Sequence, residues 1–358
     1  MPAPQVPSAS HPSSGRRRLR SLLLSLVLML VVLGCLVGFA ILVPPDRYTP
    51  LTGQPDSQVT LLAVGDQGTG DLQQWRVAQG MERVAEGEGG VNMVLLLGDN
   101  FYGASLKGTG DLAWQLKFER VYHGRWLSRV PFYAVLGNHD SPGSDAAELE
   151  YAHQGLGSGR WQMPDRSYTR DFGKVENRPL LRVVFLDTNQ DSAGLARQMA
   201  FLEAAFSRPG PAPIWKMVVA HHVLRSSGGK HGENQELLRQ LLPAMQRSAV
   251  DIYLSGHEHN QQLIVRPGEP AWLISGGGGQ SLDAPPPIGP KADTPFAAER
   301  HGFARLAFTA AQLQLTYYDA NGGQAQPFLW TRACQGMALE CLRHSDRMPS
   351  AMSRASAQ

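Results

Sequence analysis

Five short blocks of this sequence place metal-binding side chains directly after a run of apolar residues. They are VGDQG (64–68), LGDNFY (97–102), LGNHD (136–140), VVAHH (218–222) and SGHEHN (255–260). Carboxylate, imidazole and amide groups gathered in this way are the donors that a metal site requires. One acidic residue after a strand is equally well explained as a turn residue or a helix cap, but five such blocks together predict a metal centre.

The runs that precede these blocks are short, apolar and rich in β-branched residues, a pattern that predicts buried strands. Such runs occupy residues 59–64, 91–97, 131–136, 180–187, 214–220 and 251–255. Helix-compatible segments alternate with them at 71–87, 112–122, 193–206 and 234–246. This alternation predicts an α/β layered fold, in which ligands collect at the carboxyl ends of the strands.

Four later runs are bounded by Gly, Pro and Asn, and we expect them to be antiparallel strands that complete a second sheet. They occupy residues 261–267, 271–275, 303–309 and 312–319.

The order of the five blocks resembles the metallophosphoesterase superfamily, whose usual pattern is D-x-H, G-D-x-x, G-N-H-[DE], a distal His and G-H-x-H. The resemblance covers residues 58 to about 320. The first block departs from the pattern, because Gly68 stands where the superfamily has His, while Tyr102 appears three residues after Asp99. This pair of changes, D-x-G with G-D-x-x-Y, resembles the purple acid phosphatases. It implies an α/β fold of four αββα layers with two mixed sheets.

The resemblance also implies two metal sites that share one carboxylate. It assigns an iron ion to Asp66, Asp99, Tyr102 and His259. It assigns a second, divalent ion to Asn138, His221 and His257, with Asp99 bridging the two metals. The phenolate oxygen of Tyr102 is an anionic hard ligand in place of a neutral imidazole, which favours Fe(III). The second metal stays open between Fe, Zn and Mn.

Two residues fit the distal histidine of this pattern, His221 and His222. We favour His221, because related acid phosphatases carry H-H-x-x-R-S after this strand and the chain matches that motif without a gap from His221. In the last block, His257 and His259 leave the same side of an extended segment, since side chains alternate along it. Glu258 between them is therefore expected to face away.

Two further histidines match positions that lie beside the metals in the resembled family. His139 follows Asn138 in the third block, and His231 lies in a segment rich in Gly and Ser. An imidazole at either position is suited to contact a phosphoryl oxygen or to protonate the leaving alkoxide, and Asp140 is placed to orient His139. For His231, the alternative is a solvated loop histidine.

A pair of metal ions can bind phosphoryl oxygens, acidify a water molecule and stabilise both oxygens of an in-line displacement. The resemblance therefore implies that a metal-bridged hydroxide hydrolyses the monoesters of small phosphorylated substrates. No G-x-S-x-G elbow or Cys nucleophile signature offers a covalent route instead. A phosphodiesterase or nucleotide hydrolase with the same ligands is one alternative. A non-catalytic, metal-stabilised membrane binding module is another, although it would be expected to lack some of the ligands.

The N-terminus carries a segment long enough to cross a membrane. Residues 21–43 contain no charged side chain, and about 20 apolar residues suffice to span a bilayer. The preceding tail, 1–20, carries four arginines and is expected to stay in the cytoplasm, so a single-pass anchor would leave the body extracytoplasmic. One alternative is a signal peptide cut after Ala40, which would release a secreted protein; another is a lipoprotein signal at Cys35.

The rest of the chain divides by composition. Residues 44–57 contain four prolines and are expected to form a linker. We expect a catalytic domain over 58–330 and a partly disordered C-terminal extension over 331–358. The formal net charge of +2 includes the four N-terminal arginines, so the remaining chain is slightly acidic. This balance argues against a nucleic-acid partner.

The body contains two cysteines, Cys334 and Cys341. Seven residues apart on a continuous helix, they would be separated by about 10 Å, which exceeds the reach of a disulfide. A bond therefore requires a bend, for instance at Gly336. A disulfide formed in an oxidising compartment and two free thiols both fit the sequence.

Overall fold

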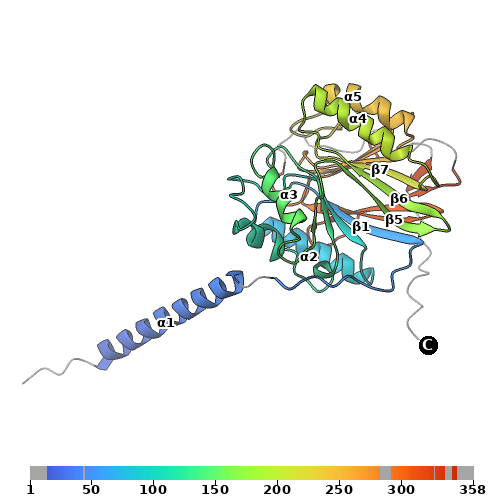
Figure 1. The fold of residues 1–358 in the computed structure, drawn as a ribbon. Coiled ribbons are helices and arrows are strands. Elements are labelled where there is room, and N and C mark those ends of the chain that lie inside the picture. Colours follow the sequence, from blue (N-terminus) through green and yellow to red (C-terminus); the bar gives the residue numbers. More distant parts are fainter. Residues whose placement is uncertain (1–13, 43–44, 283–291, 326, 335–340, 345–358) are drawn as a thin grey trace, which may run out of the picture. The chain divides into compact units, whose positions relative to one another are not determined.

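The computed structural model of the protein describes residues 14–42, 45–282, 292–325, 327–334 and 341–344 (Figure 1). The chain divides into two compact units, residues 1–44 and 45–358. In the first unit, helix α1 covers Ser14–Leu42. Its stretch Arg18–Cys35 is long and apolar enough to cross a membrane by length and composition, a property that a signal sequence at this place shares.

The second unit contains two mixed β-sheets. In the described residues, the first sheet has eight strands in the order β15-β14-β13-β12-β1-β2-β3-β4. These strands are Leu342–His344, Phe328–Thr331, Gln312–Asp319, Gly302–Thr309, Gln58–Val64, Met93–Leu96, Phe132–Ala134 and Trp161–Gln162. Strand β1 pairs antiparallel with β12 and parallel with β2, and β3 and β4 continue the parallel part.

The second sheet has seven strands among the residues described, in the order β11-β9-β10-β8-β7-β6-β5. These are Phe296–Ala298, Gln261–Ile264, Ala271–Ser275, Ile252–Ser255, Trp215–Val219, Arg178–Phe185 and Tyr168–Val175. Strands β6, β7, β8 and β10 run parallel, and the remaining pairs are antiparallel. Both sheets are mixed, as the sequence resemblance implied.

Helices cover the outer faces of the two sheets. Helices α4 (Ser192–Phe206) and α5 (Gln235–Arg247) lie over the second sheet, and α2 (Leu72–Gly87) lies on the opposite side of the unit (Figure 1). Helix α3 covers Asp145–His153, a π turn η1 covers Gln115–Glu119, and a 3-10 turn η2 covers Leu127–Arg129. The result is the expected αββα order of layers.

Apolar side chains fill the space between these layers. Leu61 and Leu306 of the first sheet belong to the same buried cluster as Met217 and Leu254 of the second. A second cluster, which includes Leu202 of α4 and Leu241 of α5, lies between the helices and the second sheet. Most central strands are thus buried on both faces, which explains why their sequences are continuous apolar runs rather than alternating ones.

Two sequence predictions about these elements were wrong. Strands β12 and β13 are antiparallel, but they belong to the sheet of β1 rather than to the second sheet, because β12 pairs with β1 along six residues from Gln58 to Ala63. The helix expected over 112–122 is reduced to η1. This wide turn buries Glu119, whose carboxylate lies 3.0 Å from the guanidinium of Arg160 in the core.

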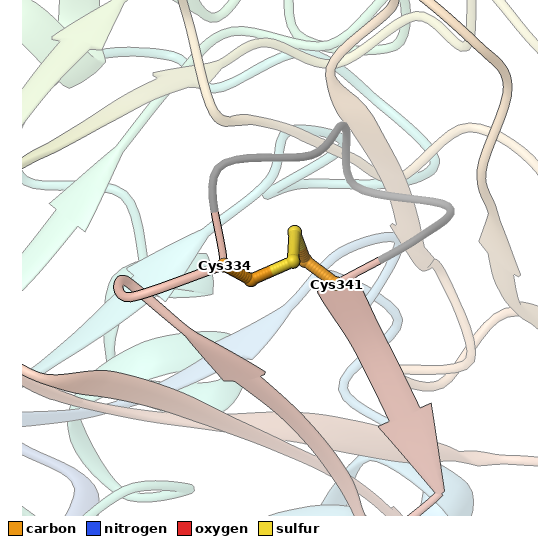
Figure 2. Close-up of a disulfide and its surroundings, with 2 residues drawn as sticks. All are labelled: Cys334 and Cys341. Atoms are coloured by element: carbon orange, nitrogen blue, oxygen red, sulfur yellow. A yellow bond between two sulfur atoms is a disulfide. The ribbon is translucent and has the colours of Figure 1, made fainter.

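The two ends of the second unit are tied to its body. In residues 45–57, the backbone N–H of Tyr48 donates to the carbonyl of Ser158 over 2.9 Å. At the other end, a disulfide joins Cys334 to Cys341, with Cα atoms 5.5 Å apart (Figure 2). Of the two options that the sequence left open, the structure therefore has the bonded one. Gly336, where a bend was expected, lies outside the described residues.

Candidate metal centre

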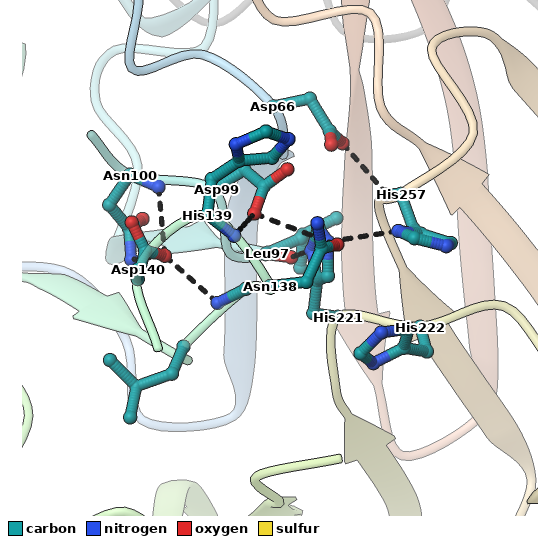
Figure 3. Close-up of polar contacts among 12 residues, drawn as sticks. Asp66, Leu97, Asp99, Asn100, Asn138, His139, Asp140, His221, His222 and His257 are labelled. Carbon is teal, nitrogen blue, oxygen red and sulfur yellow. Dashed lines mark hydrogen bonds and ion pairs between the residues drawn. The ribbon is translucent and has the colours of Figure 1, made fainter. Parts of the chain in front are cut away.

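The predicted ligands lie in loops that follow the carboxyl ends of strands in both sheets. Figure 3 shows Asp66, Asp99, Asn138, His221 and His257 among them. In the first sheet, Asp66 follows β1, Asp99 and Tyr102 follow β2, and Asn138 follows β3. In the second sheet, His221 follows β7, and His257 and His259 follow β8. The centre therefore forms where the edges of the two sheets meet, as expected for an α/β fold.

Three of these residues surround the hydroxyl group of a fourth, Tyr102. The hydroxyl lies 2.8 Å from Asp99 Oδ2, 3.2 Å from Asp66 Oδ1 and 3.2 Å from His259 Nε2. His259 Nε2 is also 3.5 Å from Asp66 Oδ1. These are the four residues that the sequence assigned to iron.

The other predicted ligands surround His221 Nε2. This atom lies 3.0 Å from Asn138 Oδ1, 3.2 Å from His257 Nδ1 and 3.4 Å from Asp99 Oδ1. Asp99 therefore contacts both groups, with Oδ2 directed to Tyr102 and Oδ1 to His221. Ligand atoms of Asp66, Asp99 and His221 all lie within 4.8 Å of one another.

Backbone carbonyl groups set the tautomers of two histidines. The carbonyl of Leu97 lies 2.8 Å from His221 Nδ1, and the carbonyl of Ser281 lies 2.8 Å from His259 Nδ1. A carbonyl oxygen only accepts hydrogen bonds, so in each ring the proton is on Nδ1. In the neutral ring, which is the form that binds a metal, the Nε2 lone pair then faces the centre, the usual arrangement around a metal-binding imidazole.

The backbone is strained at three of the predicted ligands. Asp66, Asp99 and His257 have φ values of 59°, 53° and 67°, a left-handed conformation that costs roughly 1–3 kcal/mol at a non-glycine residue. Hydrogen bonds hold these turns, among them one from the backbone N–H of His257 to Asp66 Oδ2 over 2.8 Å. Strain of this kind concentrates at functional sites, and here it directs the side chains into one place.

Two glycines in the motifs have no room for a side chain, because the side chains of predicted metal ligands approach their Cα atoms closely. A Cβ atom at Gly98, where φ is +89°, would lie 2.6 Å from His221 Nδ1. A Cβ atom at Gly137 would lie 2.1 Å from Asp99 Oδ1. Any side chain at either position would displace a predicted ligand.

The buried acidic groups of the centre need a positive charge. Burial raises the pKa of Asp66 above its usual value. Burial also raises the pKa of Tyr102 far above its usual value, and the charges of Asp66 and Asp99 add to this effect. Burial opposes ionisation of Asp99 as well, but the charge of His221 and the N–H of His139 bring its pKa below the usual value. Such a set of buried oxygens is ionised together only beside cations, so it fits metal ions.

His221 and His222 have different surroundings. His222 Nδ1 lies 2.8 Å from Thr188 Oγ1, and the backbone carbonyl of His222 accepts a hydrogen bond from Tyr253. Burial, followed by the charge of His221, lowers the pKa of His222 to about 3. The geometry therefore brings His221 into the centre and leaves His222 beside it.

The two predicted catalytic histidines lie next to different parts of the centre. The ring of His139 is 4.6 Å from that of Tyr102, and its backbone N–H donates to Asp99 Oδ1 over 2.9 Å. The ring of His231 stacks on that of His257, with centroids 4.0 Å apart. His231 and His257 line a pocket of about 320 Å³.

The sequence placed Asp140 to orient His139, but the contacts of its carboxylate show a different function, which is to support these loops. Asp140 accepts backbone N–H groups of Asn100, Phe101 and Gly137, so it joins the loops after β2 and β3. The side-chain amide of Asn100 donates to both Asp140 and Glu148. Burial, then the charge of Asp99, raises the pKa of Asp140 to about 7. Glu148 lies in α3 outside any motif, and no local signal marks it.

Comparisons with known proteins agree with this geometry. Residues 59–261 match the model of the calcineurin-like phosphoesterase family. The chain is 31% identical over 316 residues to purple acid phosphatase 4 of Arabidopsis thaliana, covering 84% of this chain and 91% of that protein. It is 28% identical over 257 residues to human tartrate-resistant acid phosphatase type 5, covering 65% and 77%.

Solved structures show the same fold. GAP50, described as the anchor in the inner membrane complex of Plasmodium, superposes with a TM-score of 0.66 at 23% identity, covering 75% of this chain and 86% of GAP50. Purple acid phosphatase PPD1 of yellow lupin superposes with a TM-score of 0.62 at 21% identity, covering 85% and 58%. With its five metal-ligand blocks gathered where the edges of the two sheets meet, the chain belongs to the purple acid phosphatase branch of the calcineurin-like phosphoesterases and is a metal-dependent phosphoric ester hydrolase.

Proposed function

We propose that the protein is an acid phosphatase that hydrolyses phosphate monoesters of small molecules with a dinuclear Fe(III)-M(II) centre. The observation that carries this proposal is the position of the Tyr102 hydroxyl, within 3.2 Å of Asp66, Asp99 and His259. Burial and two carboxylates oppose ionisation of this phenol in the polypeptide alone. A phenolate here therefore requires a strongly charged, hard cation, which favours Fe(III).

We assign the ligands to two metals according to the two groups of residues described above, one around the Tyr102 hydroxyl and one around His221 Nε2. Iron would be held by Asp66, Asp99, Tyr102 and His259, and Asp99 would also be a ligand of the second metal. That metal, which is Fe, Zn or Mn, would be held by Asn138, His221 and His257. When bound, the two ions acidify a water molecule and neutralise charge on the phosphoryl oxygens.

The remaining work of the reaction falls to two histidines. His139 lies beside Tyr102, where its imidazole is suited to bind a phosphoryl oxygen. His231 lies on the other side, against His257 and at the wall of the pocket. There it is placed to give a proton to the oxygen of the leaving alcohol as the P–O bond breaks, so that the alcohol departs neutral and the ring ends uncharged.

The test compares the wild-type protein with Tyr102→Phe. We expect two metal ions per chain, a visible absorption band from tyrosinate bound to iron, and hydrolysis of an aryl phosphate monoester at acidic pH. Tyr102→Phe removes the band. Tyr133→Phe is the matched control, because this half-buried tyrosine packs on Phe172 away from the centre, and it keeps the band.

Two outcomes would change the proposal. A colourless, iron-free protein that still hydrolyses the phosphate would reject Fe(III) and leave the phosphoesterase activity standing. Faster hydrolysis of a bis-aryl phosphate than of the monoester would replace the monoesterase with a phosphodiesterase.

We also propose that residues 21–43 anchor the protein in a membrane as a single span, with the catalytic domain extracytoplasmic. Two observations support this topology: the apolar character of α1 and the arginines that precede it. The disulfide between Cys334 and Cys341 adds support, because such bonds persist in oxidising compartments.

A further inference from the structure

Glu258 is a buried carboxylate between two predicted metal ligands, His257 and His259. Its side chain accepts hydrogen bonds from three consecutive backbone N–H groups. Lys230 N lies 2.7 Å from Oε2, while His231 N and Gly232 N lie 2.9 Å and 2.5 Å from Oε1. A carboxylate removed from water is costly unless such donors surround it, and hydrogen bonds to an ionised acceptor are about twice as strong as neutral ones.

The loop of residues 226–232 is shaped to fit this carboxylate. At Gly229, φ is +135° and a Cβ atom would lie 2.0 Å from Glu258 Oε2. The backbone thus approaches the carboxylate more closely than any residue with a side chain allows. Successive N–H groups that converge on one anion form a backbone nest, and here the anion belongs to the protein itself.

This contact holds residues 230–232, the part of the loop that carries His231. Residues 226–232 read SSGGKHG and contain no helix or strand, and such a sequence loses much conformational entropy when it is ordered. The first part of the loop is held by other contacts, among them a hydrogen bond from the backbone N–H of Ser227 to Gln262 Oε1 over 2.7 Å. Gln262 Nε2 donates to the carbonyl of Gly228 over 2.7 Å, and Arg225 pairs with Glu269.

We propose that Glu258 is a positioning residue for His231. By holding the backbone N–H groups of residues 230–232, it keeps the His231 imidazole stacked on His257, with centroids 4.0 Å apart. One short segment, 257–259, then supplies two ligands to the metals and sets the place of the proton donor. This inference rests on the function proposed for His231, which transfers its proton to the leaving oxygen.

The experiment uses the full-length protein in detergent and two independent variants, Glu258→Gln and Gly229→Ala. The first keeps the size of the side chain but replaces one acceptor oxygen with a donor. The second leaves Glu258 intact and forces the loop away from it. Glu269→Gln is the matched control, since it removes a partly buried carboxylate that anchors the start of the same loop through Arg225 without contacting the backbone of His231.

Three quantities are measured: metal content, amide hydrogen exchange of residues 230–232, and kcat for an alkyl and a nitrophenyl phosphate. The alkyl ester has the poorer leaving group and depends more on a proton donor, whose contribution is typically 10²–10⁴-fold. In both test variants we expect full metal content, faster exchange at residues 230–232, and kcat for the alkyl ester lowered by about 10- to 100-fold. We expect kcat for the nitrophenyl ester to change by less than about threefold. Glu269→Gln keeps the wild-type ratio of the two rates.

A double-mutant cycle with His231→Ala separates positioning from general damage. If Glu258 acts through His231, Glu258→Gln causes no further loss of alkyl phosphate hydrolysis in the His231→Ala background. An equal loss in both backgrounds, loss of a metal ion in Glu258→Gln, or unchanged exchange at 230–232 would each overturn the proposal. An inactive wild-type protein would instead refute the proposed function, and hydrogen exchange would still report on the contact.

Discussion

His221 and His222 are adjacent in the chain, yet their imidazoles face different partners. His221 Nε2 lies 3.0 Å from Asn138 Oδ1 inside the centre, whereas His222 Nδ1 lies 2.8 Å from Thr188 Oγ1 outside it. The pair offers a direct test of the ligand assignment.

We expect His221→Ala to lose one metal ion per chain and His222→Ala to keep both. Activity should fall in His221→Ala by more than the roughly 10- to 100-fold that follows loss of a group supporting a ligand. In His222→Ala, activity should fall by less than this 10- to 100-fold range. Metal analysis and kcat measure the two effects. Loss of the metal ion from His222→Ala alone would reverse the assignment.

Gly137→Ala is expected to remove metal without changing any donor. Its Cβ atom would lie 2.1 Å from Asp99 Oδ1, and Asp99 is the proposed bridge between both ions. We therefore expect less than one metal ion per chain and loss of activity. Gly87→Ala serves as the control, since a Cβ atom there meets nothing within 4 Å. Two bound metals in Gly137→Ala would contradict the close contact.

Glu148→Gln is expected to change how stability depends on pH. Burial, and then the charge of Asp140, raises the pKa of Glu148 well above its usual value. Protonation of Glu148 contributes fully to the free energy of unfolding below the pKa of Glu in the unfolded chain, about 4.3. This contribution is lost as the pH rises through the pKa of Glu148 in the folded protein. The variant has no such proton to lose. Its stability relative to wild type should therefore rise by up to about 1.4 kcal/mol per pH unit in that window.

Urea unfolding between pH 4 and pH 8, with metals removed by a chelator, measures this difference. Glu150→Gln changes an exposed residue of the same helix and should leave the pH dependence as it is in wild type. Parallel curves for Glu148→Gln and wild type would show that Glu148 is ionised in the fold.

The disulfide should stabilise the C-terminal edge of the first sheet. It closes a short loop, with Cys334 and Cys341 seven residues apart, and a cross-link of this size contributes about 2–3 kcal/mol. We expect the double change Cys334→Ser, Cys341→Ser to lower the free energy of unfolding by this amount. Cys35→Ser, at the free cysteine of α1, should not. A wild-type unfolding midpoint that is unaffected by a reducing agent would argue against the bond.

The proposed membrane anchor predicts that the protein is recovered in the membrane fraction rather than as a soluble chain. If residues 21–43 are an anchor, the mature chain keeps its first residues and resists carbonate extraction from membranes. Terminal sequencing of the purified protein and its distribution between membrane and soluble fractions give the answer. A soluble chain that begins at Ile41 would establish cleavage after Ala40.

The sequence by itself named the candidate metal ligands. Each candidate follows a strand within a few residues, so each motif is adjacent in the sequence to the strand that positions it. The exchange of His for Gly68, together with Tyr102, marked the purple acid phosphatase branch before any contact was known. The α/β class also followed from local patterns, because strands buried on both faces are recognisable as short apolar runs.

Other features depend on contacts between residues that are distant in sequence, and only the tertiary structure decided them. The identical side chains of His221 and His222 differ only in what surrounds them, and Leu97 and Asn138 come from another sheet. Strand β12 joined the first sheet because of its register with β1. Glu148 lies outside any motif and Glu258 is not a predicted ligand of its motif, so the significance of both comes from burial against backbone N–H groups and amides supplied by loops far away in sequence. Burial and orientation are properties of the packed chain, so local sequence carries no record of them.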